Sequence, residues 1–219
     1  MENILITGAN RGIGLELSRL FQARGSTVYA TCRKVSAELD ALEINVIEGI
    51  DVSDPQSIDK LSRALDGIKL DILINNAGIL TRETLEDLNF ERIRKQFEVN
   101  TLGPLRVISA LQENLSDHSK VGILTSRVGS IEDNGSGGIY GYRISKAAAN
   151  MVGKNLSHDL AKRNITVILL HPGLVATEMT GRTGIDPADA ARGIIARIDE
   201  LSMENTGSFW HAEGYQLPW

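Results

Sequence analysis

The stretch Thr7-Gly8-Ala9-Asn10-Arg11-Gly12-Ile13-Gly14 decides the fold of this chain of 219 residues. It follows a short apolar run, Asn3–Thr7, and opens directly into a segment with helical periodicity, Ile13–Arg24. Glycines at a strand-to-helix turn permit a tight turn and a close approach of backbone to a pyrophosphate, whose charge the helix N-terminus favours. The stretch therefore predicts the nucleotide-binding end of an α/β fold.

The spacing of these glycines is Gly-xxx-Gly-x-Gly, which differs from the Gly-x-Gly-xx-Gly of the common dinucleotide fingerprint. Taken alone, the turn has a second interpretation as a sharp corner between a strand and a helix. A P-loop for nucleoside triphosphates is disfavoured because no Gly-Lys-Ser/Thr closes the pattern.

Short β-branched runs alternate with longer helical segments along the rest of the chain. The predicted strands are Asn3–Thr7, Thr27–Thr31, Asn45–Gly49, Asp71–Asn75, Val121–Ser126, Thr166–His171 and Gly207–Trp210. The predicted helices are Ile13–Arg24, Pro55–Leu65, Phe90–Leu115 and Tyr142–Arg163, and Gly129–Gly141 is predicted as a loop. Apolar strands alternating with helices indicate a parallel sheet covered on both faces. We expect a single Rossmann-type, doubly wound α/β domain over residues 1–219, with a parallel seven-stranded sheet and helices on both faces.

The composition excludes several classes of protein. With 23 basic and 28 acidic residues the net charge is -5, and no basic block interleaved with aromatics predicts a nucleic-acid partner. The most apolar run, Val167–Leu170, is far too short to span a membrane. The N-terminus lacks the features of a signal peptide, so we expect a cytoplasmic protein. Cys32 is the single cysteine, which excludes a disulfide framework and a cysteine-rich zinc site, and we expect no metal.

The end of the second predicted strand distinguishes the two nicotinamide cofactors. An acidic residue there would bind the adenosine ribose 2′-hydroxyl and repel a 2′-phosphate. The stretch Ala30-Thr31-Cys32-Arg33-Lys34 has no carboxylate. Arg33 offers a planar fork of donors to phosphate, and Arg11 in the glycine turn is expected on the same side. The sequence therefore favours NADP(H) over NAD(H).

Seven motifs, in order and at the predicted strand ends, resemble the short-chain dehydrogenase/reductase family over nearly the full chain. They are the glycine turn, Asp51-Val52, Asn75-Asn76-Ala77-Gly78, Asn100, Ser126, Tyr142-xxx-Lys146 and Pro172-Gly173 with Thr177. The C-terminal tail and the residues around Tyr142 are most similar to small carbonyl reductases of the Sniffer/C-factor group. The resemblance implies cofactor contacts from Gly8, Asn10, Arg11, Gly12, Ile13, Gly14, Arg33, Asp51, Val52, Asn76, Ala77, Gly78, Tyr142, Lys146, Pro172, Gly173, Val175 and Thr177.

The expected catalytic residues are Asn100, Ser126, Tyr142 and Lys146. Tyr142 and Lys146 are four residues apart and share one helix face, so the lysine cation should lower the pKa of the phenol from about 10 by up to about three units. The phenol would then serve as general acid/base near neutral pH. Ser126 would hydrogen-bond the substrate oxygen. The resemblance implies that Asn100 holds a water that resupplies the proton.

Neighbouring side chains offer alternatives to this assignment. Tyr140 is a second phenol, but Ile144 stands four residues after it and cannot lower its pKa. His171 ends an apolar strand, which is typical of a structural histidine. Asn75 is expected to brace neighbouring strands, which assigns the cofactor contact to Asn76.

The sequence predicts an NADP(H)-dependent oxidoreductase that transfers hydride between the nicotinamide and a small carbonyl or alcohol. The alternative is a dinucleotide-binding regulator or signalling protein of C-factor type with little catalysis. A serine hydrolase is disfavoured because no Gly-x-Ser-x-Gly elbow occurs. The segment from Thr180 to Asp186, where many relatives carry a substrate lid, is short, so the sequence does not identify the substrate. The two long predicted helices resemble those through which relatives form a homodimer or homotetramer.

Overall fold

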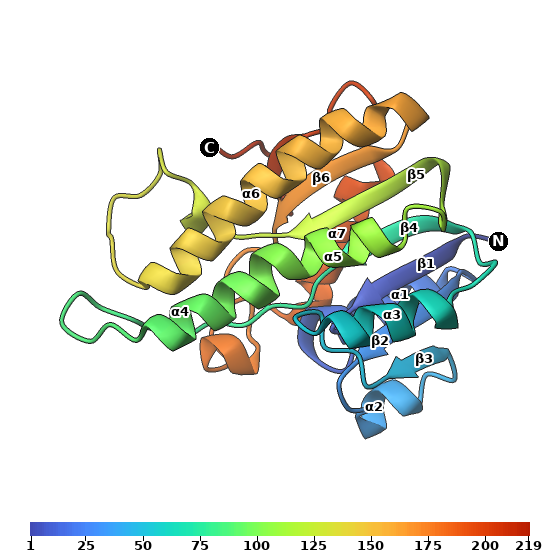
Figure 1. The fold of residues 1–219 in the computed structure, drawn as a ribbon, viewed down its shortest axis with the longest axis horizontal. Coiled ribbons are helices and arrows are strands. Elements are labelled where there is room, and N and C mark those ends of the chain that lie inside the picture. The colour runs from blue at the N-terminus through green and yellow to red at the C-terminus, as the bar shows by residue number, and fades with distance from the viewer.

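All seven strands lie in one parallel sheet in the computed structural model, which describes residues 1–219 (Figure 1). The strands are β1 (Asn3–Thr7), β2 (Thr27–Cys32), β3 (Asn45–Glu48), β4 (Leu70–Asn75), β5 (Leu115–Leu124), β6 (Thr166–His171) and β7 (Ser208–His211). Their order is β3-β2-β1-β4-β5-β6-β7. The order reverses between β1 and β4, and ligands of such sheets bind beyond the carboxyl ends of the strands at this point.

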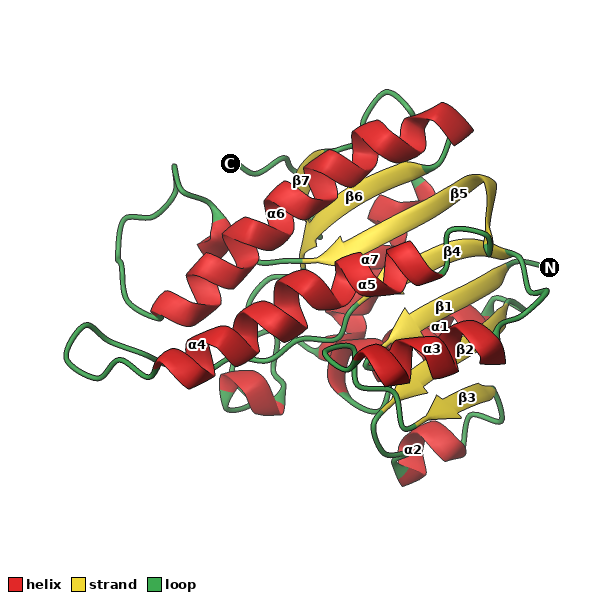
Figure 2. Cartoon of the chain, in the orientation of Figure 1, coloured by secondary structure: helices red, strands yellow, loops and turns green.

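Helices cover both faces of the sheet (Figure 2). They are α1 (Gly12–Ala23), α2 (Ala37–Asp40), α3 (Pro55–Ala64), α4 (Phe90–Phe97), α5 (Gly103–Ala110), α6 (Tyr140–Leu160) and α7 (Pro187–Asp199). The strand side chains alternate between two cores, because Ile4 and Ile6 pack with α1 and α7, whereas Leu5 packs with α3, α5 and α6. The predicted doubly wound fold is confirmed. None of the helices has the length and apolar content needed to cross a bilayer.

The predicted helix Phe90–Leu115 was wrong as a single element. The chain forms α4, then a π-helical turn over Glu98–Leu102, then α5, and Leu115 already belongs to β5. Pro104 explains the irregularity, because it has no N–H to donate to the carbonyl of Asn100 four residues earlier. The π-helical turn places Asn100 on the buried side, facing α6.

Two other predicted elements also differ from the structure by two or more residues at their ends. β5 starts earlier than predicted, because Leu115 pairs with Leu70 before the register shifts, and it ends at Leu124. Ser126 follows the strand and accepts a hydrogen bond from the amide of Val128 in the 3₁₀ turn Arg127–Gly129. α6 begins two residues before the predicted start, at Tyr140. The helices α2 and α7 were not predicted.

Candidate active site

A cleft of about 480 Å³ opens at the carboxyl ends of the central strands, where the order of the sheet reverses. Most of the residues predicted from the sequence line it. These are Gly8, Asn10, Arg11, Gly12, Ile13, Arg33, Asp51, Val52, Asn76, Ala77, Gly78, Tyr142, Lys146, Pro172 and Thr177. Residues that are separate in the sequence therefore converge on one surface.

The glycine turn after β1 is built for close backbone approach. Gly8 has φ +67°, and a Cβ there would lie 2.8 Å from the Cα of Ala77, a distance that real Cβ atoms avoid. A Cβ on Gly14 would lie 2.5 Å from the carbonyl oxygen of Gly8, so this glycine lets α1 pack against the turn. The interpretation as a cofactor turn gains support over a simple corner, because Gly8 and Gly12 also line the cleft.

The N-terminus of α1 has no side chain that caps it. The N-cap residue Arg11 makes no capping hydrogen bond, and no acidic residue lies in the first turn of the helix. The first N–H groups of a helix lack partners inside the helix and attract anions. This end of α1 therefore fits a pyrophosphate.

The two arginines of the cleft differ in their partners. Arg11 forms an ion pair with Glu178, so its charge is already matched and the prediction that it joins Arg33 on a phosphate loses support. Arg33 directly follows β2, and its side chain is exposed at the cleft. Lys95, which the sequence analysis missed, lies at the same end of the cleft and donates to Ser53 at 2.8 Å.

Asp51 joins these cations at the adenine end of the cleft. Burial alone would raise the pKa of its carboxyl group. Hydrogen bonds from Ser53 and the charges of Lys95 and Arg33 outweigh this effect, so the pKa of Asp51 lies below its usual value. Asp51 is therefore an anionic acceptor beside two cations.

The bracing role expected of Asn75 belongs to Asn76. The amide of Asn76 donates to the carbonyl oxygens of Thr7 at 2.9 Å and Gly8 at 3.0 Å, so it is Asn76 that braces β1 against β4. Asn75 is buried, and its amide nitrogen has no hydrogen-bond partner. Asn76 still lines the cleft, while its side-chain nitrogen is committed to the turn.

The acid/base candidates come together near the N-terminal end of α6. Lys146 is 5% exposed, and its Nζ donates to the carbonyl oxygen of Leu124 at 2.8 Å. The same Nζ lies 5.7 Å from the centroid of the Tyr142 ring. The side chain of Ser126 hydrogen-bonds the phenol of Tyr142. A phenol, a hydroxyl and an ammonium thus meet beside one cleft.

The expected fall in the pKa of Tyr142 was wrong for this arrangement. Burial raises the pKa of Tyr142 to about 12, against a smaller lowering by the hydrogen bond with Ser126. Burial also lowers the pKa of Lys146 to about 8. The simple Coulomb argument omitted desolvation, which opposes the charged form of both groups. Tyr142 is therefore a neutral phenol at pH 7.

Both polar atoms of the Asn100 side chain form hydrogen bonds within the protein. Its Oδ1 accepts from the amide of Ile79 at 2.8 Å, and its Nδ2 donates to the carbonyl of Ile79 at 2.8 Å and to Ser145 at 3.0 Å. It nevertheless lies close to Lys146, because a Cβ on Gly78 would be 3.3 Å from Oδ1 of Asn100 and 3.7 Å from Nζ of Lys146. Both polar atoms border the space above Gly78.

Some predicted residues do not line the cleft itself. They are Gly14, Asn100, Ser126, Gly173 and Val175. Val175 is buried and pairs with Ile185 through a β-bridge, whereas a Cβ on Gly173 would lie 3.6 Å from the ring of His211. These two residues shape the loop after β6. The sequence analysis missed the lining residues Ile79, Val99 and Thr125.

His171 does not line the cleft. Burial and the neighbouring His211 lower the pKa of His171 to about 3, and its Nδ1 is buried without a partner. The ring packs edge-on against His211, with 4.9 Å between the centroids. A histidine held neutral in this way fits the structural role expected for it.

Comparison with known proteins identifies the family. The model of the short chain dehydrogenase family matches residues 2–187. The chain therefore belongs to the short-chain dehydrogenase family and is an oxidoreductase of that family. It is 46% identical over 226 residues to 1-hydroxy-2-glutathionyl-2-methyl-3-butene dehydrogenase of Rhodococcus sp. strain AD45, with all of both chains covered. It is also 42% identical over 154 residues to the C-signal protein of Myxococcus xanthus, covering 68% of this chain and 93% of that one.

Solved structures give the same result. The carbonyl reductase Sniffer of D. melanogaster aligns over 100% of both chains with a TM-score of 0.92 and 28% identity. An NADPH-bound carbonyl reductase from chicken fatty liver aligns over 100% of this chain and 99% of its own, with a TM-score of 0.88 and 30% identity. The predicted resemblance to the Sniffer/C-factor group is confirmed.

Proposed function

We propose that the protein is an NADP(H)-dependent oxidoreductase that interconverts a carbonyl, such as an aldehyde, ketone or quinone, and the corresponding alcohol. The observation that carries the proposal is the half-buried neutral phenol of Tyr142, hydrogen-bonded to Ser126 and beside Lys146 at the wall of the cleft. A neutral phenol is the protonation state that a general acid needs.

The residues of the cleft fit a dinucleotide with a 2′-phosphate. The glycine turn and the uncapped end of α1 would hold the pyrophosphate. Arg33 and Lys95 supply positive charge near Asp51, at the end where the adenosine would lie. Gly78, which lies beside Lys146, and Ala77, Pro172 and Thr177 also line the cleft. Bound there, the nicotinamide would supply or accept the hydride.

The side chains around Tyr142 would transfer a proton to the carbonyl oxygen and replace it afterwards. In the direction of reduction, Tyr142 donates its phenolic proton to the carbonyl oxygen, and Ser126 donates a hydrogen bond to the same oxygen. Lys146, protonated below its pKa of about 8, stabilises the phenolate that develops on Tyr142. The space above Gly78, bordered by Asn100 and Lys146, suits a water that returns the proton.

An activity panel tests the proposal. The protein is assayed with NADPH and NADH against aldehydes, ketones and quinones, and in the reverse direction with alcohols that include a glutathione-linked alcohol, because the relative from Rhodococcus is named for one. We expect turnover of at least one class with NADPH preferred. Absence of turnover with every class and both cofactors would overturn the proposal.

Arg33 is expected to set the preference for NADPH. Replacing it with glutamine removes a charge-assisted contact, so KM for NADPH should rise by about 10- to 100-fold while KM for NADH stays nearly unchanged. Steady-state kinetics with both cofactors measures the ratio. Lys34→Gln is the control, because Lys34 is the next residue, is exposed and does not line the cleft. Equal effects of both variants would contradict the assignment.

The second candidate function is a dinucleotide-binding regulator, and the similarity to the C-signal protein favours it. The same panel separates the two candidates. Tight binding of NADPH without turnover of any carbonyl would support the regulator. Assembly into a homodimer or homotetramer stays a prediction.

A further inference from the structure

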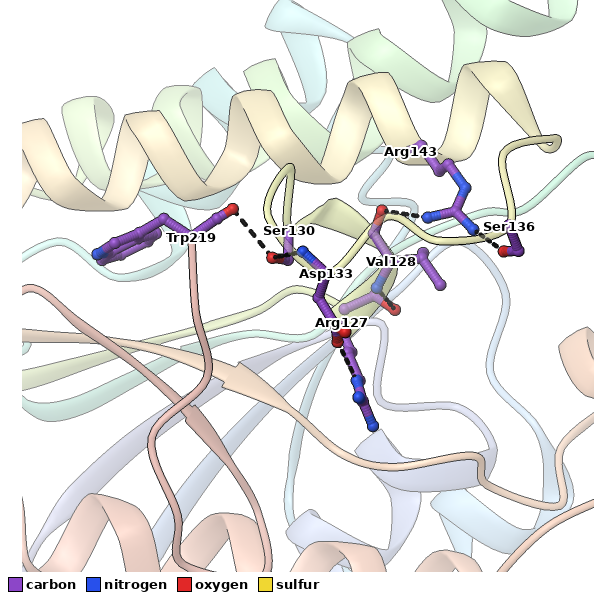
Figure 3. Close-up of polar contacts among 8 residues, drawn as sticks. Arg127, Val128, Ser130, Asp133, Ser136, Arg143 and Trp219 are labelled. Atoms are coloured by element: carbon purple, nitrogen blue, oxygen red, sulfur yellow. Dashed lines mark hydrogen bonds and ion pairs between the residues drawn. The ribbon is translucent and has the colours of Figure 1, made fainter.

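A segment that the proposed mechanism does not use lies directly beside the candidate acid/base pair. It comprises residues 127–138, here named the Ser126 loop because it follows Ser126 and leads into α6. The close-up of its polar contacts in Figure 3 shows the guanidinium of Arg143 of α6 and the main-chain oxygen of Trp219, both directed at this loop. The start of α6 and the far more distant Trp219 therefore both hold the loop.

Arg143 forms hydrogen bonds with both ends of the Ser126 loop. Its Nη1 donates to the carbonyl oxygen of Val128 at 3.1 Å, and its Nε donates to the carbonyl oxygen of Gly137 at 3.0 Å. Its Nη2 donates to the hydroxyl of Ser136 at 2.8 Å. Arg143 directly follows Tyr142 on α6, so one guanidinium joins both ends of the loop to the helix that carries the phenol.

A second set of hydrogen bonds holds the middle of the loop. The carbonyl oxygen of Trp219 accepts from the hydroxyl of Ser130 at 3.0 Å and from the amide of Ile131 at 2.5 Å. Ser130 in turn accepts from the amide of Asp133 at 3.0 Å, and Asp133 pairs with Arg127. The loop is thus anchored at its ends by α6 and in its middle by the chain end.

The loop also touches the backbone of the candidate lysine. A Cβ on Gly129 would lie 2.7 Å from the carbonyl carbon of Lys146, so the start of the loop packs directly on α6. Ser126 lies immediately before this contact and hydrogen-bonds Tyr142. A displacement of residues 127–129 would therefore move Ser126 relative to Tyr142.

We propose that Arg143 is a positioning residue for the carbonyl substrate, because it fixes the Ser126 loop against α6 and thereby holds Ser126 at the phenol. The inference rests on the proposed oxidoreductase function. Arg143 itself does not line the cleft, so it acts through the loop and leaves the cofactor residues untouched. A preformed loop reduces the ordering that substrate binding requires. Loss of Arg143 should therefore weaken the binding of the carbonyl substrate and leave the binding of NADPH nearly unchanged.

The test compares the wild type with Arg143→Met and Arg143→Lys. We expect Arg143→Met to raise KM for the best carbonyl of the panel by about 10-fold or more, with the Kd for NADPH changed by less than about twofold. Arg143→Lys should recover part of the loss, because an ammonium replaces some of the three bonds. Ser136→Ala, which removes one acceptor, should show a smaller change in the same direction.

Arg163→Met is the matched control. Arg163 makes an equivalent brace far from the cleft, donating to the carbonyl oxygens of Gln112 at 2.9 Å and Leu115. It should lower stability without changing KM. Amide hydrogen exchange of residues 128–137 provides a readout independent of activity and should increase in Arg143→Met alone.

The outcomes separate this inference from the proposed function. A wild type without activity defeats the proposed function, and hydrogen exchange still reports whether Arg143 holds the loop. An active wild type with unchanged KM and unchanged exchange in Arg143→Met overturns the positioning role. Equal rises in KM for Arg143→Met and Arg163→Met would also overturn it, because the effect would then be one of general stability.

Discussion

Replacing Tyr142 with phenylalanine is expected to lower kcat for carbonyl reduction by about 10²- to 10⁴-fold, the contribution typical of a positioned general acid. The change removes the phenolic proton and the hydrogen bond with Ser126 while it keeps the half-buried ring. The fold and the affinity for NADPH should persist. Steady-state kinetics, together with NADPH binding by fluorescence, measures both quantities.

Tyr140→Phe is the matched control for this variant. Tyr140 begins α6 two residues earlier, is 37% exposed and does not line the cleft. Its loss should change kcat by less than about twofold, as for most surface substitutions away from a site. A Tyr142→Phe enzyme with nearly full kcat, or a Tyr140→Phe enzyme with a large loss, would contradict the assignment of the acid.

The pH dependence of Tyr142→Phe carries further information. With the pKa of Tyr142 at about 12 and that of Lys146 at about 8, the wild type loses the ammonium before the phenol ionises. The reduction rate of the wild type should therefore decline above about pH 8. The residual rate of Tyr142→Phe should be flat over the same range, because no phenolate needs the ammonium.

The fold could be predicted largely from local patterns. Most strands are short apolar runs that contain β-branched residues. The buried alternation of Ile4, Leu5 and Ile6 shows why a sheet covered on both faces follows from such runs. The missed helix α7 also had a signal, because Asp186-Pro187 is a favourable helix start. Ile194 and Ile198 then repeat on one face of that helix. The break at Pro104 was equally visible.

The partners of charged groups could not be predicted from the sequence. Arg11 and Glu178 are 167 residues apart in the chain, and their ion pair arises only because the loops after β1 and β6 end at one edge. Motif spacing located Tyr142 and Lys146 but contained no measure of burial. Burial reverses the expected shift of the Tyr142 pKa, since desolvation disfavours the phenolate.

Replacing Lys146 with methionine should abolish most activity and yet stabilise the cofactor-free protein at pH 7. An ammonium about 4 Å from the developing phenolate contributes about 4 kcal/mol at an effective dielectric near 20, so kcat should fall by up to about 10³-fold. In the folded state the pKa of this lysine is about 8, whereas the ordinary value is 10.5. At about 1.36 kcal/mol per unit, burial of the ammonium opposes folding by about 3 kcal/mol below pH 8.

The gain in stability should disappear as the pH rises. Between pH 8 and 10.5 the unfolded chain binds a proton that the folded protein does not, so the wild type becomes more stable with increasing pH. The lost hydrogen bond to Leu124 offsets about 1 kcal/mol of the gain at every pH. Lys146→Met should therefore unfold at higher denaturant concentration at pH 7 and at slightly lower concentration at pH 10.5.

Lys154→Met separates burial from helix effects in this comparison. Lys154 lies on the same helix and donates to the carbonyl oxygen of Gly207 at 3.2 Å, but its side chain is only half-buried. Its replacement should lower stability slightly at both pH values. If Lys146→Met destabilised the protein equally at pH 7 and pH 10.5, the ammonium would not be held at a cost to folding. A stabilised and inactive Lys146→Met would instead show that the protein keeps a buried ammonium that opposes folding because the reaction requires it.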